Sequence, residues 1–257
     1  MYKTKNYEVR KLDDVYREIN AVAKAYPNTH KIFLADGDAL SLPSEHLLTI
    51  LKQLQKSFPK LRRVSLYASA QNILSKSQEE LTTLYENKLN LIYYGIETGS
   101  NLLLKKITKG VSQREIIDSL NRASNAGMKV SATVILGIGG EKYSKEHIEK
   151  TAEIINATRV NYLSTLQLGL EEDVKENFYK HFSDFNPLDD FQILEEQKRF
   201  IELLYPRNKI IFRSNHASNA LHLSGILPRD KERLLKELEY ALKIGKAAFV
   251  PAAFRGF

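Results

Sequence analysis

Five short apolar segments of the chain end in polar or glycine-rich residues. The segments are 31–35, 64–68, 91–96, 130–136 and 162–168, and their length and composition predict buried strands. In parallel α/β folds the chemistry is carried at the carboxyl ends of the strands. The candidate residues at these points are Asp36, Gly37, Asp38, Ala39, Ser69, Glu97, Thr98, Gly99, Ser100, Gly137, Ile138, Gly139, Gly140 and Gln167.

Two of these points hold carboxylates. Asp36 and Asp38 follow the first segment, where they either form a tight turn or bind an amino group, a hydroxyl group or a divalent metal. Glu97 ends an apolar strand, and a carboxylate there is costly to bury without a partner. We therefore expect Glu97 to face either a ligand or an internal Lys or Arg.

Two other stretches favour binding through backbone or hydrogen-bonding groups. Gly137-Ile138-Gly139-Gly140 lacks the Gly-x-Gly-x-x-Gly spacing of dinucleotide sites, so it is either a tight loop or a surface where a flat ring approaches bare backbone. The segment 212–219 is rich in donors and small residues, which is typical of binding loops. Its candidates for a substrate or cofactor loop are Arg213, Asn215, His216 and Asn219.

The elements that position these residues alternate along the chain. Apolar residues at helical spacing predict helices at 12–26, 44–54, 78–86, 101–106, 113–126, 145–157, 191–204 and 230–244, with Ser44 as an N-cap. Strand starts about 30 to 40 residues apart indicate βαβ units and a parallel sheet, either a (β/α) barrel or a doubly wound sheet. We expect one domain over 1–257, with a core at 10–170 and a C-terminal α/β extension at 171–257 that contains a strand at 209–212.

The series opens with a helix, although the first helix of such a fold packs against a preceding strand. Residues 1–9 are too polar for a central strand, so we expect the first strand to lie upstream of Met1.

Composition narrows the function classes. The chain has 257 residues, a formal net charge of +7 and no cysteine. The absence of cysteine excludes disulfides, zinc-thiolate sites, catalytic thiols and cysteine-ligated iron–sulfur clusters within this chain. The lysines are scattered over predicted helices, which indicates solvated faces rather than a nucleic-acid patch. No apolar run reaches the roughly 20 residues of a membrane span and the start lacks a signal peptide, so we expect a cytoplasmic protein that does not contact membranes.

Four motifs, taken in order, resemble the radical S-adenosylmethionine (SAM) superfamily, and most of all its iron–sulfur oxidoreductase-like members of unassigned reaction. They are Ala35-Asp36-Gly37-Asp38-Ala39, the strand end Tyr94 to Ser100, Lys109-Gly110, and Val134 to Gly140. The resemblance implies a partial (β/α) barrel of the TIM type, here without its first strand, that holds SAM across the strand ends. It also implies an enzyme.

The same resemblance assigns roles to the candidates. Residues 36–39 match the loop that holds the methionine amino group, although this family usually has Gly-Gly-Glu-Pro there. Glu97 matches the position that binds ribose hydroxyls, and Ile138 and Gly139 match the loop whose backbone meets adenine. Ser69, Ser131 and Gln167 are expected to line the same site.

The family's Cys-x-x-x-Cys-x-x-Cys loop, which ligates a [4Fe–4S] cluster, is absent from this sequence. In relatives a Met-Tyr-Lys-like segment follows the last cysteine, and this chain begins with Met1-Tyr2-Lys3, so we expect an N-terminal truncation. A full-length form would use the cluster to cleave SAM to a 5′-deoxyadenosyl radical, with an external electron donor and a small-molecule, peptide or RNA substrate. The chain as printed is expected to be inactive.

Two alternatives stay open on the residues alone. One is a magnesium-dependent barrel enzyme that uses Asp36, Asp38 and Glu97 as oxygen ligands. The other is a non-catalytic, cysteine-free module that binds a nucleotide or RNA through its basic surface.

Overall fold

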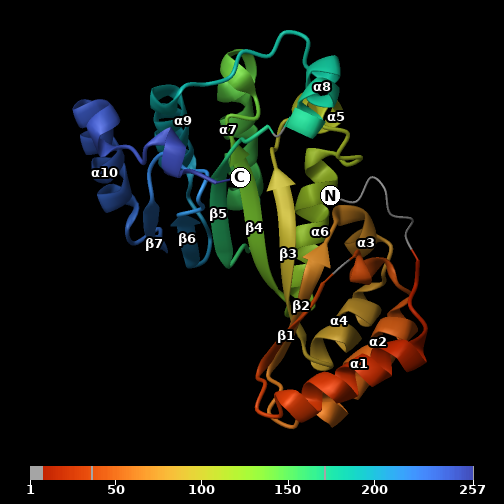
Figure 1. Ribbon diagram of the computed structural model, residues 1–257. Helices are drawn as coiled ribbons and strands as arrows, with labels where there is room; N and C mark the ends of the chain where they lie inside the picture. Colours follow the sequence, from red (N-terminus) through yellow and green to blue (C-terminus); the bar gives the residue numbers. More distant parts are fainter. Residues whose placement is uncertain (1–7, 36, 171, 257) are drawn as a thin grey trace. The chain divides into compact units, whose positions relative to one another are not determined.

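The computed structural model describes residues 8–35, 37–170 and 172–256, so the polar start of the chain and Asp36 lie outside it (Figure 1). The chain forms two compact units. The first comprises the residues up to Tyr94 together with Arg122–Lys129, and the second comprises Gly95–Asn121 and the residues from Val130 onward. The strands follow one another in the sheet in the same order as in the sequence, from β1 to β7.

The first unit has a parallel sheet with helices packed on it. Strand pairs β1–β2 and β2–β3 are parallel, and α1 and α2 lie side by side (Figure 1). Leu47, Leu51 and Leu54 recur at helical spacing and are buried, so α2 presents an apolar face. The elements are α1 Leu12–Ala25, β1 Lys31–Leu34, the 3₁₀ helix η1 Ala39–Ser41, α2 Ser44–Ser57, β2 Arg63–Ala68, α3 Ala70–Leu74, α4 Gln78–Glu86 and β3 Leu89–Glu97, whose last three residues belong to the second unit.

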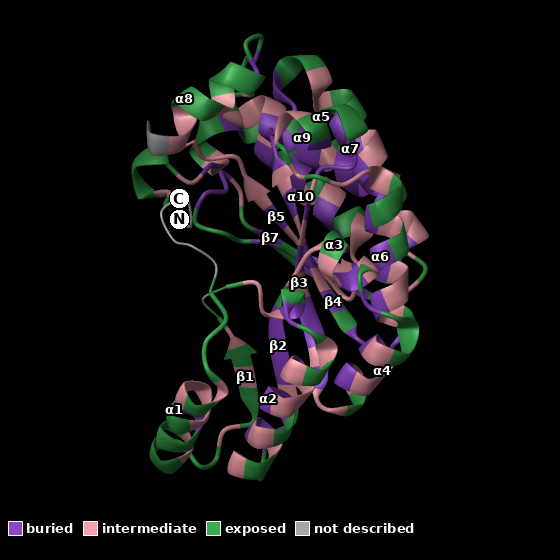
Figure 2. Ribbon diagram, turned by 90° about the vertical axis from the view of Figure 1, so that its right-hand side faces the viewer, coloured by how far each residue is buried: buried purple, intermediate pink, exposed green. Residues whose placement is uncertain are grey.

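Strand burial differs sharply within the first unit. In β2, Val64, Ser65 and Leu66 are all buried, whereas the four residues of β1 are exposed or half-buried (Figure 2). This difference follows from the strand order, because β1 is an edge strand and β2 has a neighbour on each side.

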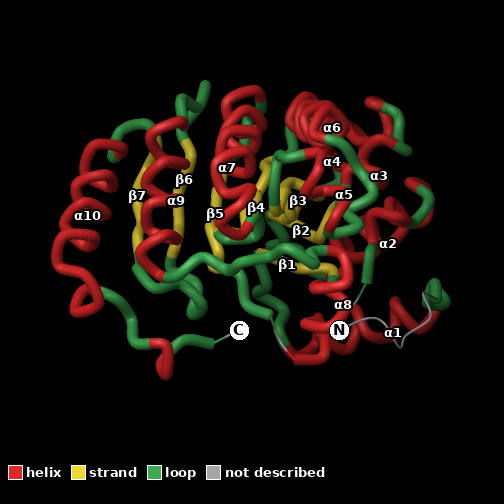
Figure 3. The backbone as a smooth tube through the Cα atoms, turned by 90° about the horizontal axis from the view of Figure 1, so that it is seen from above, coloured by secondary structure: helices red, strands yellow, loops and turns green. Residues whose placement is uncertain are grey.

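The second unit continues the alternation of strands and helices. Pairs β4–β5 and β5–β6 are parallel and β6–β7 is antiparallel. Helices α7, α9 and α10 lie in a row along the strands of this unit (Figure 3). The elements are α5 Asn101–Lys106, α6 Gln113–Asn125, β4 Lys129–Leu136, α7 Gly140–Ala157, β5 Tyr162–Gln167, α8 Glu172–His181, α9 Asp190–Leu203, β6 Ile210–Ser214, β7 Leu223–Leu227, α10 Lys231–Ile244 and the 3₁₀ helices η2 Gly245–Ala248 and η3 Ala252–Phe254. The last four residues of α6 and the first residue of β4 belong to the first unit.

Local chemistry explains where the helices of the second unit begin. Asp189 caps α9: its carboxylate accepts the Gln192 N–H at 2.9 Å, and the Gln192 side chain accepts the Asp189 N–H at 2.8 Å. Helix α7 begins at Gly140, the last residue of the glycine-rich segment, five residues before the predicted start. The carboxyl end of β4 therefore runs almost directly into a helix N-terminus.

The predicted α/β architecture with a parallel-dominated sheet is confirmed, and so are the five apolar strands and the strand at 209–212. Two helices and one strand, α3, α8 and β7, were not predicted. The prediction of Ser44 as an N-cap is wrong, because Pro43 occupies the cap position and makes no side-chain capping bond. The expectation about residues 1–9 falls mostly on residues outside the described ranges.

Among the described residues, no helix combines the length and apolar character needed to cross a membrane.

Candidate functional site

In the first unit, the loops after β1 and β2 meet at Asn72. The Asn72 side-chain amide donates to Asp38 Oδ1, and the Asn72 backbone N–H donates to Ser69 Oγ at 3.2 Å. Ser69 is the N-cap of α3. The structure thus brings Asp38 and Ser69 to one residue, Asn72, which the sequence did not single out because α3 itself was not predicted.

A buried lysine, Lys76, contacts the segment that follows β1. Lys76 is only 5% exposed and donates from Nζ to the carbonyl oxygen of Leu42 at 2.7 Å. Burial lowers the pKa of Lys76 below its usual range. In the same segment, Gly37 is exposed and Ala39 begins η1, while Asp36 lies outside the described residues.

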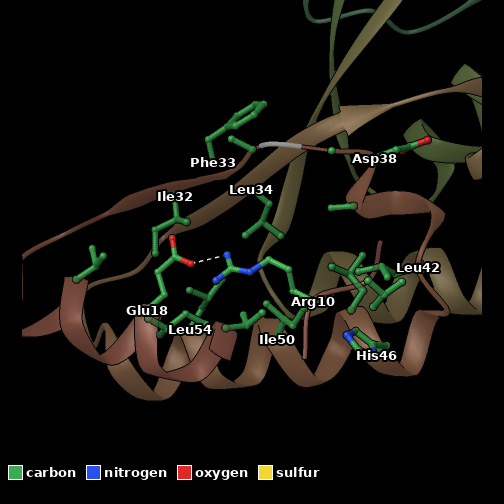
Figure 4. A pocket seen from close by; sticks show the side chains of 18 of the residues that line it. Arg10, Glu18, Ile32, Phe33, Leu34, Asp38, Leu42, His46, Ile50 and Leu54 are labelled. Atoms are coloured by element: carbon green, nitrogen blue, oxygen red, sulfur yellow. Dashed lines mark hydrogen bonds and ion pairs between the residues drawn. The ribbon is translucent and has the colours of Figure 1, made fainter. Parts of the chain in front are cut away.

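An apolar groove of about 410 Å³ borders this loop, between α1, β1 and α2. Figure 4 shows Ile32 and Leu34 of β1 pointing into it, with the ion pair between Arg10 and Glu18 beside them. Asp38 also lines the groove. The polar candidates of the first unit therefore adjoin an apolar surface along the edge strand.

In the second unit, Glu97 ends β3 in an uncommon backbone conformation. Its φ is +59°, and the Thr98 N–H donates to the Ile96 carbonyl at 2.7 Å, which closes a three-residue turn. The Glu97 carboxylate accepts from Lys109 Nζ at 3.0 Å, so the predicted internal cation is present. Backbone strain of this kind concentrates at functional sites.

Gly95 is what allows the Glu97 carboxylate to lie back across the strand. A Cβ at position 95 would stand 2.0 Å from Glu97 Oε1 and 3.2 Å from Lys109 Nζ. The pair is half-buried, with side-chain exposures of 30% for Lys109 and 21% for Glu97. One carboxylate face is therefore held by Lys109 at the carboxyl end of β3.

The glycine loop, residues Gly137–Gly140, follows β4. Gly137 has φ +80° and Gly140 has φ +54°, and the Gly140 N–H donates to the Gly137 carbonyl at 3.0 Å. A Cβ on Gly139 would stand 2.8 Å from the Tyr143 carbonyl carbon. Ile138 is buried in an apolar cluster with Leu103, Phe182 and Phe185. The loop is consequently a tight backbone structure anchored by one apolar side chain.

Two buried titratable residues beside the glycine loop were missed by the sequence analysis. Glu196 of α9 accepts the Gly137 N–H at 2.6 Å and contacts Ser144 Oγ. Burial raises the pKa of Glu196 to about 7, although the hydrogen bonds from Ser144 and Gly137 lower it. His147 of α7 is fully buried, and burial lowers its pKa to about 3.

Gln167 and Asn219 form a hydrogen-bonded link between β5 and the segment after β6. Asn219 Oδ1 accepts the Gln167 N–H at 2.7 Å, and the Gln167 side chain bonds the Ala220 N–H and the Asp190 carboxylate. Asn219 is 3% exposed and also donates to the carbonyl of Thr165. Both side chains are thus engaged in holding the C-terminal part of the second unit.

The other candidates of the second unit are placed differently. Ser131 is half-buried on β4, next to Tyr162 of β5 in the strand register. Arg213, Asn215 and His216 are exposed. His216 Nδ1 accepts the Ser218 N–H at 3.2 Å, so it organises its own loop. The structure does not place Ser131, Arg213, Asn215 and His216 together in one site.

A sequence profile of the radical SAM superfamily matches residues 2–155, which is more than half of the chain. The chain belongs to the radical SAM superfamily. The match covers the loop after β1, the Glu97 turn and the glycine loop, so the resemblance that these motifs carry is confirmed.

Two curated relatives match part of the chain. The heme chaperone HemW of Bacillus subtilis is 27% identical over 151 residues, which cover 58% of this chain and 40% of HemW. The putative methylthiotransferase MJ0865 of Methanocaldococcus jannaschii is 26% identical over 141 residues, which cover 51% of this chain and 30% of that protein. The aligned part of the chain is therefore less than half the length of either relative.

Solved structures support the fold. Archaeal Elp3 from Methanocaldococcus infernus, with an N-terminal deletion, has a TM-score of 0.61 at 13% identity and covers 88% of this chain and 59% of its own. Coproporphyrinogen III oxidase (HemN) of Escherichia coli, a radical SAM enzyme by its description, has a TM-score of 0.59 at 16% identity, covering 74% and 44%. At these identities the likeness establishes a radical SAM type of α/β fold.

The radical SAM superfamily implies two cofactors, SAM and a [4Fe–4S] cluster. The printed chain has no cysteine, and its described residues contain no group of three or more His, Asp or Glu side chains suited to a metal ion. These residues do not fit a [4Fe–4S] cluster, and they do not favour the magnesium alternative. The strained Glu97 turn does fit the ribose of an adenosine group, because it offers a half-buried carboxylate acceptor. The glycines of the loop are buried and pack against Tyr143, Phe185 and Ile193.

Proposed function

We propose that this chain is the SAM-binding core of a radical SAM enzyme. The observation that supports it best is the pair of loops at the carboxyl ends of β3 and β4 in the second unit, within a chain of this superfamily. When bound with a cluster, SAM supplies radical chemistry in such enzymes. Because this chain does not hold cluster ligands, the proposal concerns what its own residues do toward SAM.

In the second unit, the Glu97 carboxylate would accept hydrogen bonds from the ribose hydroxyls while Lys109 holds it from the other side. The backbone at Ile138 and Gly139 would contact adenine, and Ser131 would line the same site. In the first unit, Asn72 orients the Asp38 carboxylate, which by itself could accept a hydrogen bond from an amino group.

Isothermal titration of the chain with SAM tests this role of Glu97. Glu97→Gln is expected to weaken SAM binding about tenfold, since hydrogen bonds to a charged acceptor contribute roughly 1.5–3 kcal/mol. Glu232→Gln is the matched control, because Glu232 is an exposed residue of α10, and its affinity should equal that of the unaltered chain. Absence of SAM binding, or equal affinity for Glu97→Gln, contradicts the proposal.

We expect the printed chain to lack cluster-dependent activity. After anaerobic reconstitution with iron and sulfide and reduction, electron paramagnetic resonance should show no [4Fe–4S] signal, because thiolate ligands are absent. A cubane signal from this same chain would overturn that expectation.

A further inference from the structure

A buried carboxyl group holds the glycine loop from outside. Glu196 is 4% exposed, and its Oε1 accepts the N–H of Gly137 at 2.6 Å. Its Oε2 contacts the hydroxyl of Ser144 in the first turns of α7. One side chain of α9 thus ties together the first residue of the loop and the helix that follows it.

The His147 ring lies beside the Glu196 carboxyl group and does not form a hydrogen bond with it. His147 Nε2 lies 3.9 Å from Glu196 Oε1, and the backbone of Ile135 also interacts with the His147 ring. The other ring nitrogen, Nδ1, is 2.8 Å from Thr98 Oγ1, which fixes the ring. A fully buried, neutral imidazole therefore faces the carboxyl group.

A loop of this composition needs contacts with the rest of the unit to hold one conformation. Three of its four residues are glycines, and two of them, Gly137 and Gly140, have positive φ, so the free loop has a large conformational entropy to lose. Within the loop, the Gly140 N–H donates to the Gly137 carbonyl. Apart from the buried side chain of Ile138, the bond from the Gly137 N–H to Glu196 connects the start of the loop to α9.

We propose that Glu196 is a positioning residue for the glycine loop, and that the loop binds SAM well only while Glu196 is protonated. This inference rests on the proposed function for its ligand. In the protonated state Oε1 still accepts from Gly137, and the proton on Oε2 faces Ser144 Oγ. Ionisation of Glu196 places a negative charge beside a neutral His147, where the buried charge has a desolvation cost. A movement of the loop that lets water solvate the carboxylate removes this cost.

Protons can reach the carboxyl group from outside. Glu196 and Ser144 line a cavity of about 340 Å³ between α7 and α9. The other charged groups that line this cavity are exposed, and they are Glu141 and Lys145 of α7 and Glu195 and Arg199 of α9. His147 is the titratable group that faces Glu196 from within the unit.

Hydrogen exchange of the Gly137 amide, followed by NMR, tests the positioning role without SAM. Glu196→Ala should raise the exchange rate of this amide at least about tenfold, since its acceptor is removed. Glu196→Gln keeps an acceptor and a donor in place and should preserve protection. Glu195→Gln, on the exposed side of α9, is the control and should match the unaltered chain. Unchanged protection in Glu196→Ala overturns the positioning role, and if that variant does not fold, loss of protection in Glu196→Gln overturns it.

Titration with SAM over pH tests the protonation step. The ratio of Kd for the unaltered chain to Kd for Glu196→Gln cancels the titration of SAM itself, and it should rise at least about fivefold between about pH 5 and about pH 8. A constant ratio overturns this step. If neither protein binds SAM at any pH, the proposed function fails, whereas the exchange measurement still decides whether Glu196 positions the loop.

Discussion

Replacing Gly99 by alanine is expected to lower the Tm of the chain by about 6–12 °C, which corresponds to a loss of about 3 kcal/mol. A Cβ at this position would stand 2.2 Å from the carbonyl oxygen of Lys150 and 2.6 Å from the backbone nitrogen of Thr151. Both atoms belong to the backbone of α7, so no rotamer change can relieve the clash. The substitution would also disturb the bond from the Gly99 N–H to Thr151 Oγ1, which is 2.8 Å long.

The matched control is Gly256→Ala, because the nearest atom to a Cβ there is Ala217 Cβ at an ordinary 3.7 Å. Thermal unfolding followed by circular dichroism should show the large fall for Gly99→Ala and a change within about 1–2 °C for the control. Equal Tm values for the two variants would mean that the turn after β3 does not pack against α7 as described.

The strands were predictable because each is an apolar run between polar punctuation, and the sheet's parallel order follows from their spacing. Strand β7 escaped because it is five residues long and has Gly225 at its centre. Helix α8 was not predicted because much of its sequence is polar. Its Phe178 and the following Phe182 pack in a cluster with residues from a distant part of the second unit. Pairings that depend on such long-range contacts leave little local signal.

In the candidate site, too, some residues could be predicted from the sequence and others could not. Glu97 was found because a carboxylate at the end of an apolar strand is conspicuous, and Lys109 is the partner that its burial required. Glu196 was not found because glutamate is ordinary in an amphipathic helix. A signal was nevertheless present, since Glu196 lies three residues after Ile193 and four before Phe200, on the buried face of α9.

His147 carried a similar signal. It lies four residues before Thr151 and seven before Ile154, which are both buried on α7. A titratable residue on the apolar face of a helix is either paired or held neutral. Which of the two applies depends on what the facing helix offers, and that information is not local to the sequence of α7.

Glu196→Gln is expected to gain stability relative to the unaltered chain as the pH rises. The pKa of Glu196 is about 7 in the folded chain, against 4.5 as the ordinary value. Its contribution to stability is therefore fully present below about pH 4.5 and is lost as the pH rises to about 7. The amide of glutamine does not ionise, so the variant escapes this loss. The difference in unfolding free energy should increase by about 2–3 kcal/mol between about pH 5 and pH 8, or about 5–10 °C in Tm.

His147 titrates in the opposite sense, which is why the comparison must be made between two proteins at each pH. Its pKa is lowered from 6.5 to about 3, so its contribution is present above about pH 6.5 and lost as the pH falls toward 3. Because both proteins contain His147, this contribution cancels in their difference, and Glu195→Gln controls for the change in net charge. A Tm difference that stays constant over this pH range would mean that Glu196 is ionised and paired with a protonated His147. If Glu196 and His147 are both neutral in the folded chain, the Tm difference between Glu196→Gln and the unaltered chain must increase as the pH rises.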